Sequence, residues 1–188
     1  DLVVLTASAT ITDGDADVAT DHQDINIGSA FSFVDDVPTV DVSAAVAEMP
    51  SLSTEDASTI GINSDTDTKS FSGLFTLDQQ MGADDDGTAA SLTYTLSVGK
   101  DTEGVTDLTS DGNAITLVKV GNDLVGQTSV GDPAVVTDIF KISVNSTNGS
   151  VTLTQYAEID HTVDDGSNSV ATAGLPSDLV VLTASLGY

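Results

Sequence analysis

Residues 140–155 read FKISVNSTNGSVTLTQ, and this stretch decides the fold class. Apolar residues alternate with polar ones before and after the pair Asn148-Gly149. Successive side chains of a β-strand point to opposite faces, so the alternation indicates two strands that are each buried on one face. Asn-Gly between two such runs is the strongest short-range signal for a tight hairpin. We therefore predict that residues 140–144 pair with residues 151–153.

Similar patterns recur on either side of this hairpin. Residues 115–120 lead into the turn pair Gly121-Asn122 and then into Leu124-Val125, which predicts a second hairpin. No segment carries the apolar stripe with spacing i, i+3, i+4 and i+7 that a long helix needs. About nine strands with frequent turns predict an all-β fold, and within that class a β-sandwich. The expected strands cover residues 2–11, 24–33, 39–46, 72–77, 91–98, 114–120, 123–128, 135–144 and 151–155.

The octapeptide DLVVLTAS occurs twice, unchanged, at residues 1–8 and 178–185. Its copies begin at positions 1 and 178, a spacing of 177 residues. Solenoid repeats are roughly 20–50 residues long, so a period of this length predicts a whole domain as the repeating unit. We expect the chain to be a little over one period of a tandem array cut from a longer protein.

A domain boundary is expected between two strand candidates. Asp35-Asp36-Val37-Pro38 separates them, and Pro38 cannot donate a hydrogen bond to a sheet. Residues 1–36 are then the C-terminal hairpin and linker of the preceding repeat. Residues 37–188 are most of the next repeat, without its own last hairpin. The N-terminal hairpin fills that gap in cis or by strand swapping between fragments, or residues 178–185 remain an incomplete edge.

The charge of the chain is strongly negative. Thirty acids face four lysines, giving a net charge of −26, and 26 of the acids are aspartates. Such a chain lacks the basic groups with which proteins bind nucleic acids, and anionic lipid would repel it. Aspartates predominate in turns and around hard cations such as Ca²⁺, which would also relieve the self-repulsion. A halophilic or marine surface with solvated aspartates is the alternative, and both can hold together.

Composition argues against catalysis and against membrane insertion. The two histidines, His22 and His161, are far apart, and no Gly-x-Ser-x-Gly motif is present. Cysteine and tryptophan are absent, which disfavours a zinc site and an aromatic platform for sugars. The sequence contains no run of about 18 apolar residues, the length that a membrane-spanning helix needs. We expect a protein that is not an enzyme.

Three groups of acids are candidate metal ligands because of their spacing. Residues 13–17 place carboxylates at i, i+2 and i+4 around a glycine, although the twelfth position that would hold the EF-hand glutamate is Asp24. The second group, residues 35–36, lies in the predicted linker. The third group, residues 84–86, places three adjacent carboxylates in a loop before a strand, where their charges repel one another. A plain Asp-Gly turn, a solvated linker and a solvated loop are the respective alternatives. The candidates are Asp13, Asp15 and Asp17, then Asp35 and Asp36, then Asp84, Asp85 and Asp86.

Several stretches, in this order, resemble the repeats of giant RTX adhesins that bacteria export by type I secretion. The likeness extends over nearly the whole chain and depends on the order and the tandem period more than on any one motif. The stretches are LVVLTA (residues 2–7), ITDGDAD (11–17), IGSAFSFVDDVP (27–38), FSGLFTL (71–77), AITLV (114–118) and GSVTLTQYAEIDH (149–161).

The resemblance implies an immunoglobulin-like, Greek-key extender domain outside the cell, at the cell surface. In that family, calcium at domain junctions stiffens a stalk that holds distal ligand-binding modules for adhesion or biofilm formation. Glu158 and Asp160 resemble the strand-end acidic motif of cadherin-like domains and join the candidate ligands. The expected partners are neighbouring repeats of the same polypeptide. A module that itself binds sugar, peptide or ice is the alternative.

Overall fold

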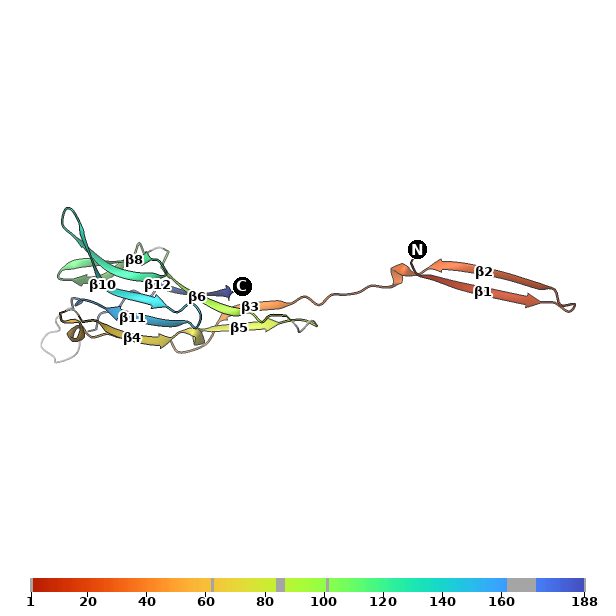
Figure 1. Ribbon diagram of the computed structural model, residues 1–188, viewed down its shortest axis with the longest axis horizontal. Helices are drawn as coiled ribbons and strands as arrows, with labels where there is room; N and C mark the ends of the chain where they lie inside the picture. The colour runs from red at the N-terminus through yellow and green to blue at the C-terminus, as the bar shows by residue number, and fades with distance from the viewer. Residues whose placement is uncertain (1, 62, 84–86, 101, 162–171, 188) are drawn as a thin grey trace. The chain divides into compact units, whose positions relative to one another are not determined.

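The fold is all-β, as predicted from the alternation (Figure 1). The computed structural model describes residues 2–61, 63–83, 87–100, 102–161 and 172–187. Within these residues the only helical segments are three short 3₁₀ turns, Gly28–Ala30, Asp56–Thr59 and Ser72–Leu74. None of them is long and apolar enough to cross a membrane. The chain divides into two compact units, Asp1–Val37 and Pro38–Tyr188.

The first unit is an antiparallel hairpin. Strand β1 (Val4–Thr12) pairs with β2 (Val18–Asn26), with Thr12 opposite Val18. The prediction of a strand over residues 24–33 was wrong. Pairing with β1 fixes the position of β2, and β2 ends where the Asn26 side chain accepts the N–H of Gly28 (2.9 Å). Alternation alone gave no information about which run would pair.

The second unit contains a six-stranded sheet in the order β4-β11-β10-β9-β8-β7. The predicted hairpin is confirmed, since Ile142 lies opposite Leu153 and Val144 opposite Val151. Five strands follow one another through hairpins, and β4 reaches its place beside β11 through a long connection, as in a Greek key. The strands are β4 (Asp65–Ser70), β7 (Val105–Ser110), β8 (Asn113–Val120), β9 (Asp123–Val130), β10 (Val135–Val144) and β11 (Ser150–Gln155).

Two strand pairs form the other layer of the sandwich. Strand β3 (Thr39–Ala44) pairs with β5 (Phe75–Gln80), and β6 (Ser91–Val98) pairs with β12 (Val180–Gly187). Strand β6 packs against β8, β9 and β10 of the six-stranded sheet. The second copy of DLVVLTAS lies at β12, whereas the first copy lies at β1.

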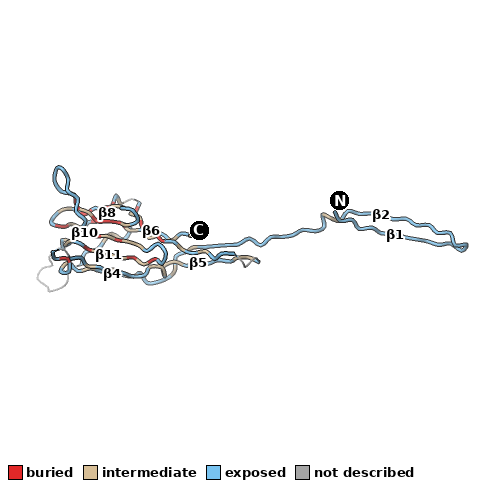
Figure 2. Tube along the Cα trace, in the orientation of Figure 1, coloured by how far each residue is buried: buried red, intermediate tan, exposed pale blue. Residues whose placement is uncertain are grey.

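The core lies between these layers (Figure 2). Phe140 is its largest side chain, and Gly126 on the neighbouring strand leaves room for it. A Cβ atom at Gly126 would lie 2.3 Å from the Phe140 ring. The register of β9 and β10 shifts at this point, between Asp138 and Phe140. The buried cluster is Leu96, Ile115, Leu117, Leu124, Ile139, Phe140, Ile142, Val151 and Leu179.

Strands β4 and β7 were not predicted. Residues 65–70 read DTDTKS and contain no apolar residue, so the strand has no hydrophobic period. Its backbone is extended because it hydrogen-bonds along β11, from Asp65 opposite Gln155 to Ser70 opposite Ser150. Strand β7 pairs with β8 across a shift of register, and this shift interrupts the alternation of apolar and polar residues in β7.

Candidate metal site

Three aspartates in the β1–β2 turn form the clearest candidate site. Asp13, Asp15 and Asp17 each offer a carboxylate oxygen, and these oxygens lie within 4.8 Å of one another. All three side chains are exposed. The turn closes through a hydrogen bond from the Asp13 N–H to the Asp17 carbonyl (3.0 Å), and Ala16 has a φ of 75°. The spacing that predicted this group therefore holds in three dimensions.

The Asp13 carboxylate organises the turn. Its Oδ1 atom accepts the N–H of Asp17 (3.0 Å) and the N–H of Asp15 (3.3 Å). A hydrogen bond with the Asp15 carboxyl, followed by these backbone donors, lowers the pKa of Asp13 below its usual value of 3.8. These hydrogen bonds favour the ionised form of Asp13, and Asp13, Asp15 and Asp17 each still offer one oxygen to a cation.

The three carboxylates fit a Ca²⁺ ion by chemistry and by spacing. Calcium binds six to eight oxygens at about 2.3–2.6 Å, so oxygens that share one ion lie up to about 5 Å apart. Three aspartates supply only part of such a shell, and backbone carbonyls or water would supply the rest. The same turn is also a stable Asp-Gly hairpin turn without any ion.

Within the first unit, the predicted ligands Asp35 and Asp36 are not part of this cluster. Asp35 and Asp36 lie in the segment between the 3₁₀ turn Gly28–Ala30 and β3, and both are exposed. Asp84, Asp85 and Asp86 lie outside the described residues.

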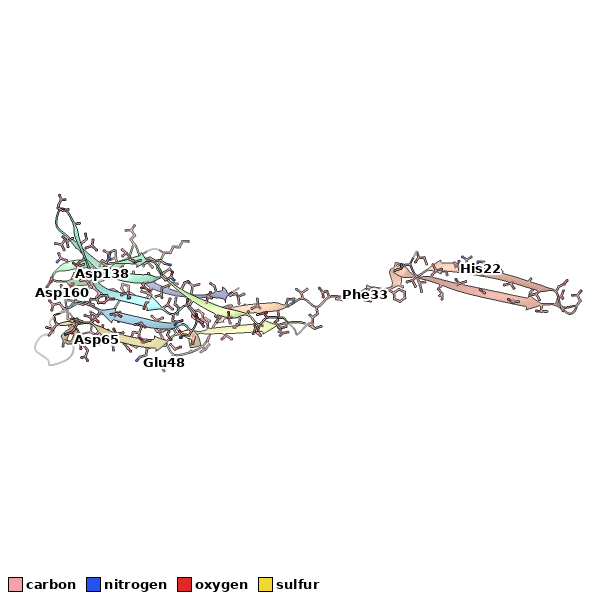
Figure 3. The ribbon with its side chains drawn as sticks, viewed as in Figure 1. His22, Phe33, Glu48, Asp65, Asp138 and Asp160 are labelled. Carbon is pink, nitrogen blue, oxygen red and sulfur yellow. The ribbon has the colours of Figure 1, made fainter. Side chains whose placement is uncertain are left out.

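Asp160, labelled in Figure 3, lies in the second unit and hydrogen-bonds to the backbone of a neighbouring hairpin. Its two oxygens accept the N–H groups of Asp111 (3.1 Å) and Gly112 (2.8 Å) at the tip of the β7–β8 hairpin. A hydrogen bond from the Thr109 side chain, then these amides, lowers the pKa of Asp160 below 3.8. Glu158 contributes its carbonyl, which accepts the Ser110 hydroxyl (2.7 Å). The acidic motif therefore ties the end of the β11 segment to β7–β8.

Sequence reasoning missed a second polar network, centred on Asp56. Its Oδ1 atom accepts hydrogen bonds from the buried Gln155 side chain and from the N–H of Ile159 (3.2 Å). Its Oδ2 atom lies 3.1 Å from Nδ1 of His161. Thr54 donates to Gln155 (2.6 Å). These residues lie about a hundred positions apart in the sequence, and no local spacing reveals them.

Asp65 and Asp67, in the adjoining edge strand β4, fix the same loop. Asp65 Oδ2 accepts the N–H of Glu55 (2.7 Å), and Asp67 Oδ2 accepts the N–H of Ser53 (3.2 Å). A hydrogen bond with Lys69, whose Nζ is 3.1 Å away, is the largest cause that lowers the pKa of Asp67. The aspartates of β4 therefore act in the folded structure as acceptors for backbone amides.

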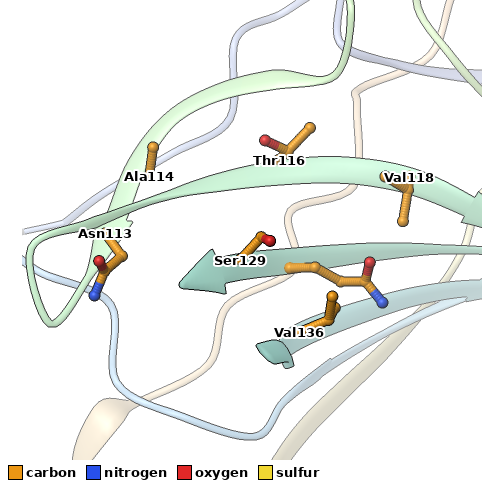
Figure 4. A pocket seen from close by; sticks show the side chains of 7 residues that line it. Asn113, Ala114, Thr116, Val118, Ser129 and Val136 are labelled. Atoms are coloured by element: carbon orange, nitrogen blue, oxygen red, sulfur yellow. The ribbon is translucent and has the colours of Figure 1, made fainter. Parts of the chain in front are cut away.

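The outer face of β8, β9 and β10 carries an open hollow of about 380 Å³ (Figure 4). Its lining includes Thr116, Val118, Gln127 and Val136, without an aromatic or charged side chain. Ligand pockets are mostly lined by apolar and aromatic side chains, with a few placed polar groups that can include a charged residue or a metal. The hollow therefore offers no chemistry that competes with the acid cluster as a candidate site.

The fold and the acidic turn define an all-β domain with a candidate cation site. Residues 44–187 match the model of a family described as a domain of unknown function (DUF5801), and the chain belongs to this family. No curated protein and no solved structure matches the chain.

Proposed function

We propose that the chain is a calcium-stiffened spacer repeat of a long bacterial surface adhesin, which projects distal ligand-binding modules for adhesion or biofilm formation. One observation carries the proposal. The same octapeptide runs into β1 in the first unit and into β12 in the second, and this supports the interpretation that the chain contains corresponding parts of two successive repeats. Domains repeated in tandem suit a long stalk, because each copy adds its own length.

The distribution of charge supports a role for calcium. The first unit carries eight aspartates and no lysine, and three of the aspartates meet in the β1–β2 turn. Asp35 and Asp36 follow shortly before β3 begins. Without counter-ions these carboxylates repel one another. When bound, Ca²⁺ would supply two positive charges and cross-link carboxylates, which restricts bending of the chain between domains.

Calcium binding and its mechanical effect are tested together. We expect Ca²⁺ to raise the melting temperature and lengthen a multi-repeat chain in small-angle scattering, relative to EDTA. Asp15→Asn should weaken Ca²⁺ binding in calorimetry by roughly tenfold, because fewer ligand charges lower affinity. Asp21→Asn removes the same charge from β2, outside the cluster, and should leave binding unchanged. Unchanged melting and scattering in EDTA would refute the proposal.

The linker acids need a separate test. The double variant Asp35→Asn with Asp36→Asn should reduce the calcium-dependent lengthening, since it removes two carboxylates between the strands of successive repeats. The Asp13, Asp15 and Asp17 cluster stays intact in this variant. Full lengthening with both linker acids replaced would show that calcium stiffens some other part of the chain.

A ligand-binding module is the second candidate function, favoured by a threonine array on β4 and β11. Thr68 and Thr152 lie opposite each other with their hydroxyls 2.8 Å apart, and Thr66 and Thr154 form the neighbouring pair at 3.4 Å. Such a flat row of hydroxyls suits a regular ligand surface. Binding on a glycan, peptide or ice surface that Thr68→Lys abolishes would favour this function over the spacer.

A further inference from the structure

The β1–β2 hairpin is amphipathic, and its apolar face is uncovered. One face is polar, with hydrogen bonds between Thr6 and Asp24 (2.5 Å) and between Thr10 and Thr20 (3.0 Å). The other face carries Leu5, Ile11 and Ile25, which are 58%, 72% and 59% exposed, and also Gln23 and Asp21 of β2. A two-stranded hairpin is at best marginally stable alone. Its sequence therefore suits a hairpin that covers another sheet.

The second copy of the octapeptide shows how this sequence packs when it is part of a covered sheet. In the second unit Leu179, the counterpart of Leu2, is fully buried in the core. Strand β12 pairs with β6, with Thr183 opposite Thr95. The equivalent of Thr183 in the first copy is Thr6. The surface beside β6 is thus complementary to the sequence that β1 carries.

The two copies use opposite edges of the same strand. In the first copy, the Val3 carbonyl accepts the N–H of Ile27 (3.1 Å), so Val3 and every second residue after it bond towards β2. In the second copy, the Leu179 carbonyl accepts the N–H of Gly99 (2.7 Å), so Leu179 and every second residue after it bond towards β6. Leu179 corresponds to Leu2, not to Val3. One strand of this sequence can therefore pair with a β6 strand and a β2 strand at once.

We propose that the β1–β2 hairpin of one copy docks on a second copy of this chain, where its β1 takes the place of β12 beside β6. The incoming strand reproduces the contacts of the octapeptide that it displaces. It adds β2 on the edge that β12 leaves open among the described strands. It also covers Ile25 of β2, an apolar contact that β12 alone does not make, and it brings Asp21 to the same face.

The direction of the strands favours pairing between copies over closure within one chain. In the docked hairpin, β2 runs back along the site of β12 and ends beside the start of that site. Strand β3 lies at the other end, where β12 ends (Figure 1). Closure within one chain would require residues 27–38 to run back beside the full length of the β12 site before β3 begins. Between two copies the same residues lead on to the next body, which produces a head-to-tail assembly.

Cysteine pairs test the register of the docked strand, because the natural chain has no cysteine. The full chain with Thr6→Cys and Thr95→Cys is oxidised in EDTA and about 1 M sodium chloride, where charges are screened within about 3 Å. We expect disulfide-linked dimers and longer ladders. Thr10→Cys with Thr95→Cys is the matched control: it lies on the same face of β1, about 14 Å out of register, and should not cross-link.

Two outcomes would overturn the proposal. One is cross-linking of the Thr6 pair no stronger than that of the Thr10 pair. The other is a disulfide within a single chain, which would show that the hairpin closes on its own body. Because EDTA is present throughout, neither outcome bears on calcium binding.

A third pair and a surface variant check the exchange itself. Thr183→Cys with Thr95→Cys should form a disulfide within one chain, hold β12 in place and abolish association until a reductant is added. Leu2→Asp should abolish association without lowering the melting temperature of the isolated chain, since Leu2 is 99% exposed. Val46→Asp, equally exposed but outside the hairpin, is its control. Association of the Leu2→Asp chain at wild-type strength would overturn the proposal.

Discussion

Leu2 and Leu179 show how much of a residue's role depends on its surroundings. They hold the same position in the same octapeptide, yet Leu2 is 99% exposed and Leu179 is fully buried. Leu179 packs with Leu96, Ile139 and the rest of the core cluster. Leu179 is buried because side chains of the second unit cover it. Those core side chains, such as Leu96 and Ile139, lie outside the octapeptide.

This difference predicts unequal costs for the same substitution. Leu179→Ala should lower the free energy of unfolding by about 2–5 kcal/mol, because it removes transfer energy and leaves a cavity. Leu2→Ala should change it by less than about 0.5 kcal/mol, as expected of an exposed site. Urea denaturation at low protein concentration measures both. Equal effects of the two variants would contradict the structure.

Asp160 illustrates a carboxylate whose partners lie in a distant hairpin. Its pKa is lowered by Thr109 and by the amides of Gly112 and Asp111, so the ionised form stabilises the fold. A lowered pKa contributes stability above the unfolded value of 3.8, and that stability is lost as the pH falls through the folded pKa. The effect should therefore vanish in acid.

Asp160→Asn tests this sign. The variant should be less stable than the wild type at pH 7, and the difference should disappear when the pH is lowered well below 3.8. Thermal denaturation over a series of pH values gives the profile. Asp41→Asn, an exposed substitution in β3, is the control. A difference that persists in acid would mean that the carboxylate is not responsible.

At the scale of elements, the two units differ in how their strands are supported. Strands β1 and β2 are exposed along their whole length, whereas β8, β9 and β10 contribute most of the buried core. Hydrogen bonds of a sheet that covers a core open less often than those of a bare hairpin.

Hydrogen exchange should separate these elements. In dilute protein without calcium, amides of β1 and β2 should exchange soonest, and amides of β9 and β10 last. The same measurement at high protein concentration should protect β1 and β2 if hairpins dock between copies. Equal protection of both hairpins in dilute protein would show that the first unit is covered by some other part of the chain.

For the whole molecule, the dominant quantity is a net charge of −26. Self-repulsion on this scale destabilises compact states, and salt screens it. We expect sodium chloride between about 0.01 and 1 M, where the screening length falls from about 30 to about 3 Å, to raise the melting temperature by several degrees.

Calcium should act beyond this general screening. At equal ionic strength, calcium chloride should raise the melting temperature further than sodium chloride does, and Asp15→Asn should reduce the excess. Magnesium chloride is a useful comparison, since Mg²⁺ gives up its water less readily and suits a tighter shell. If sodium and calcium act alike at matched ionic strength, the cation effect is screening alone.

The sequence by itself determined the class of fold and the duplicated octapeptide. Asn148-Gly149 between alternating runs predicted the β10–β11 hairpin, and the spacing of Asp13, Asp15 and Asp17 predicted a cluster of carboxylates. These features are local, because turn geometry and a period of two residues depend only on neighbours along the chain. Strand β4 was not predictable, since its extended backbone comes from pairing with β11.

Only the tertiary structure decided what depends on contacts between distant segments. It placed Asp160 at the tip of the β7–β8 hairpin, and it joined Asp56 to Gln155 across the second unit. It also gave two identical octapeptides opposite environments and opposite bonding edges. The physical reason is that the burial and the pairing of a strand depend on the segments that pack around it. The sequence of the strand alone does not specify those segments.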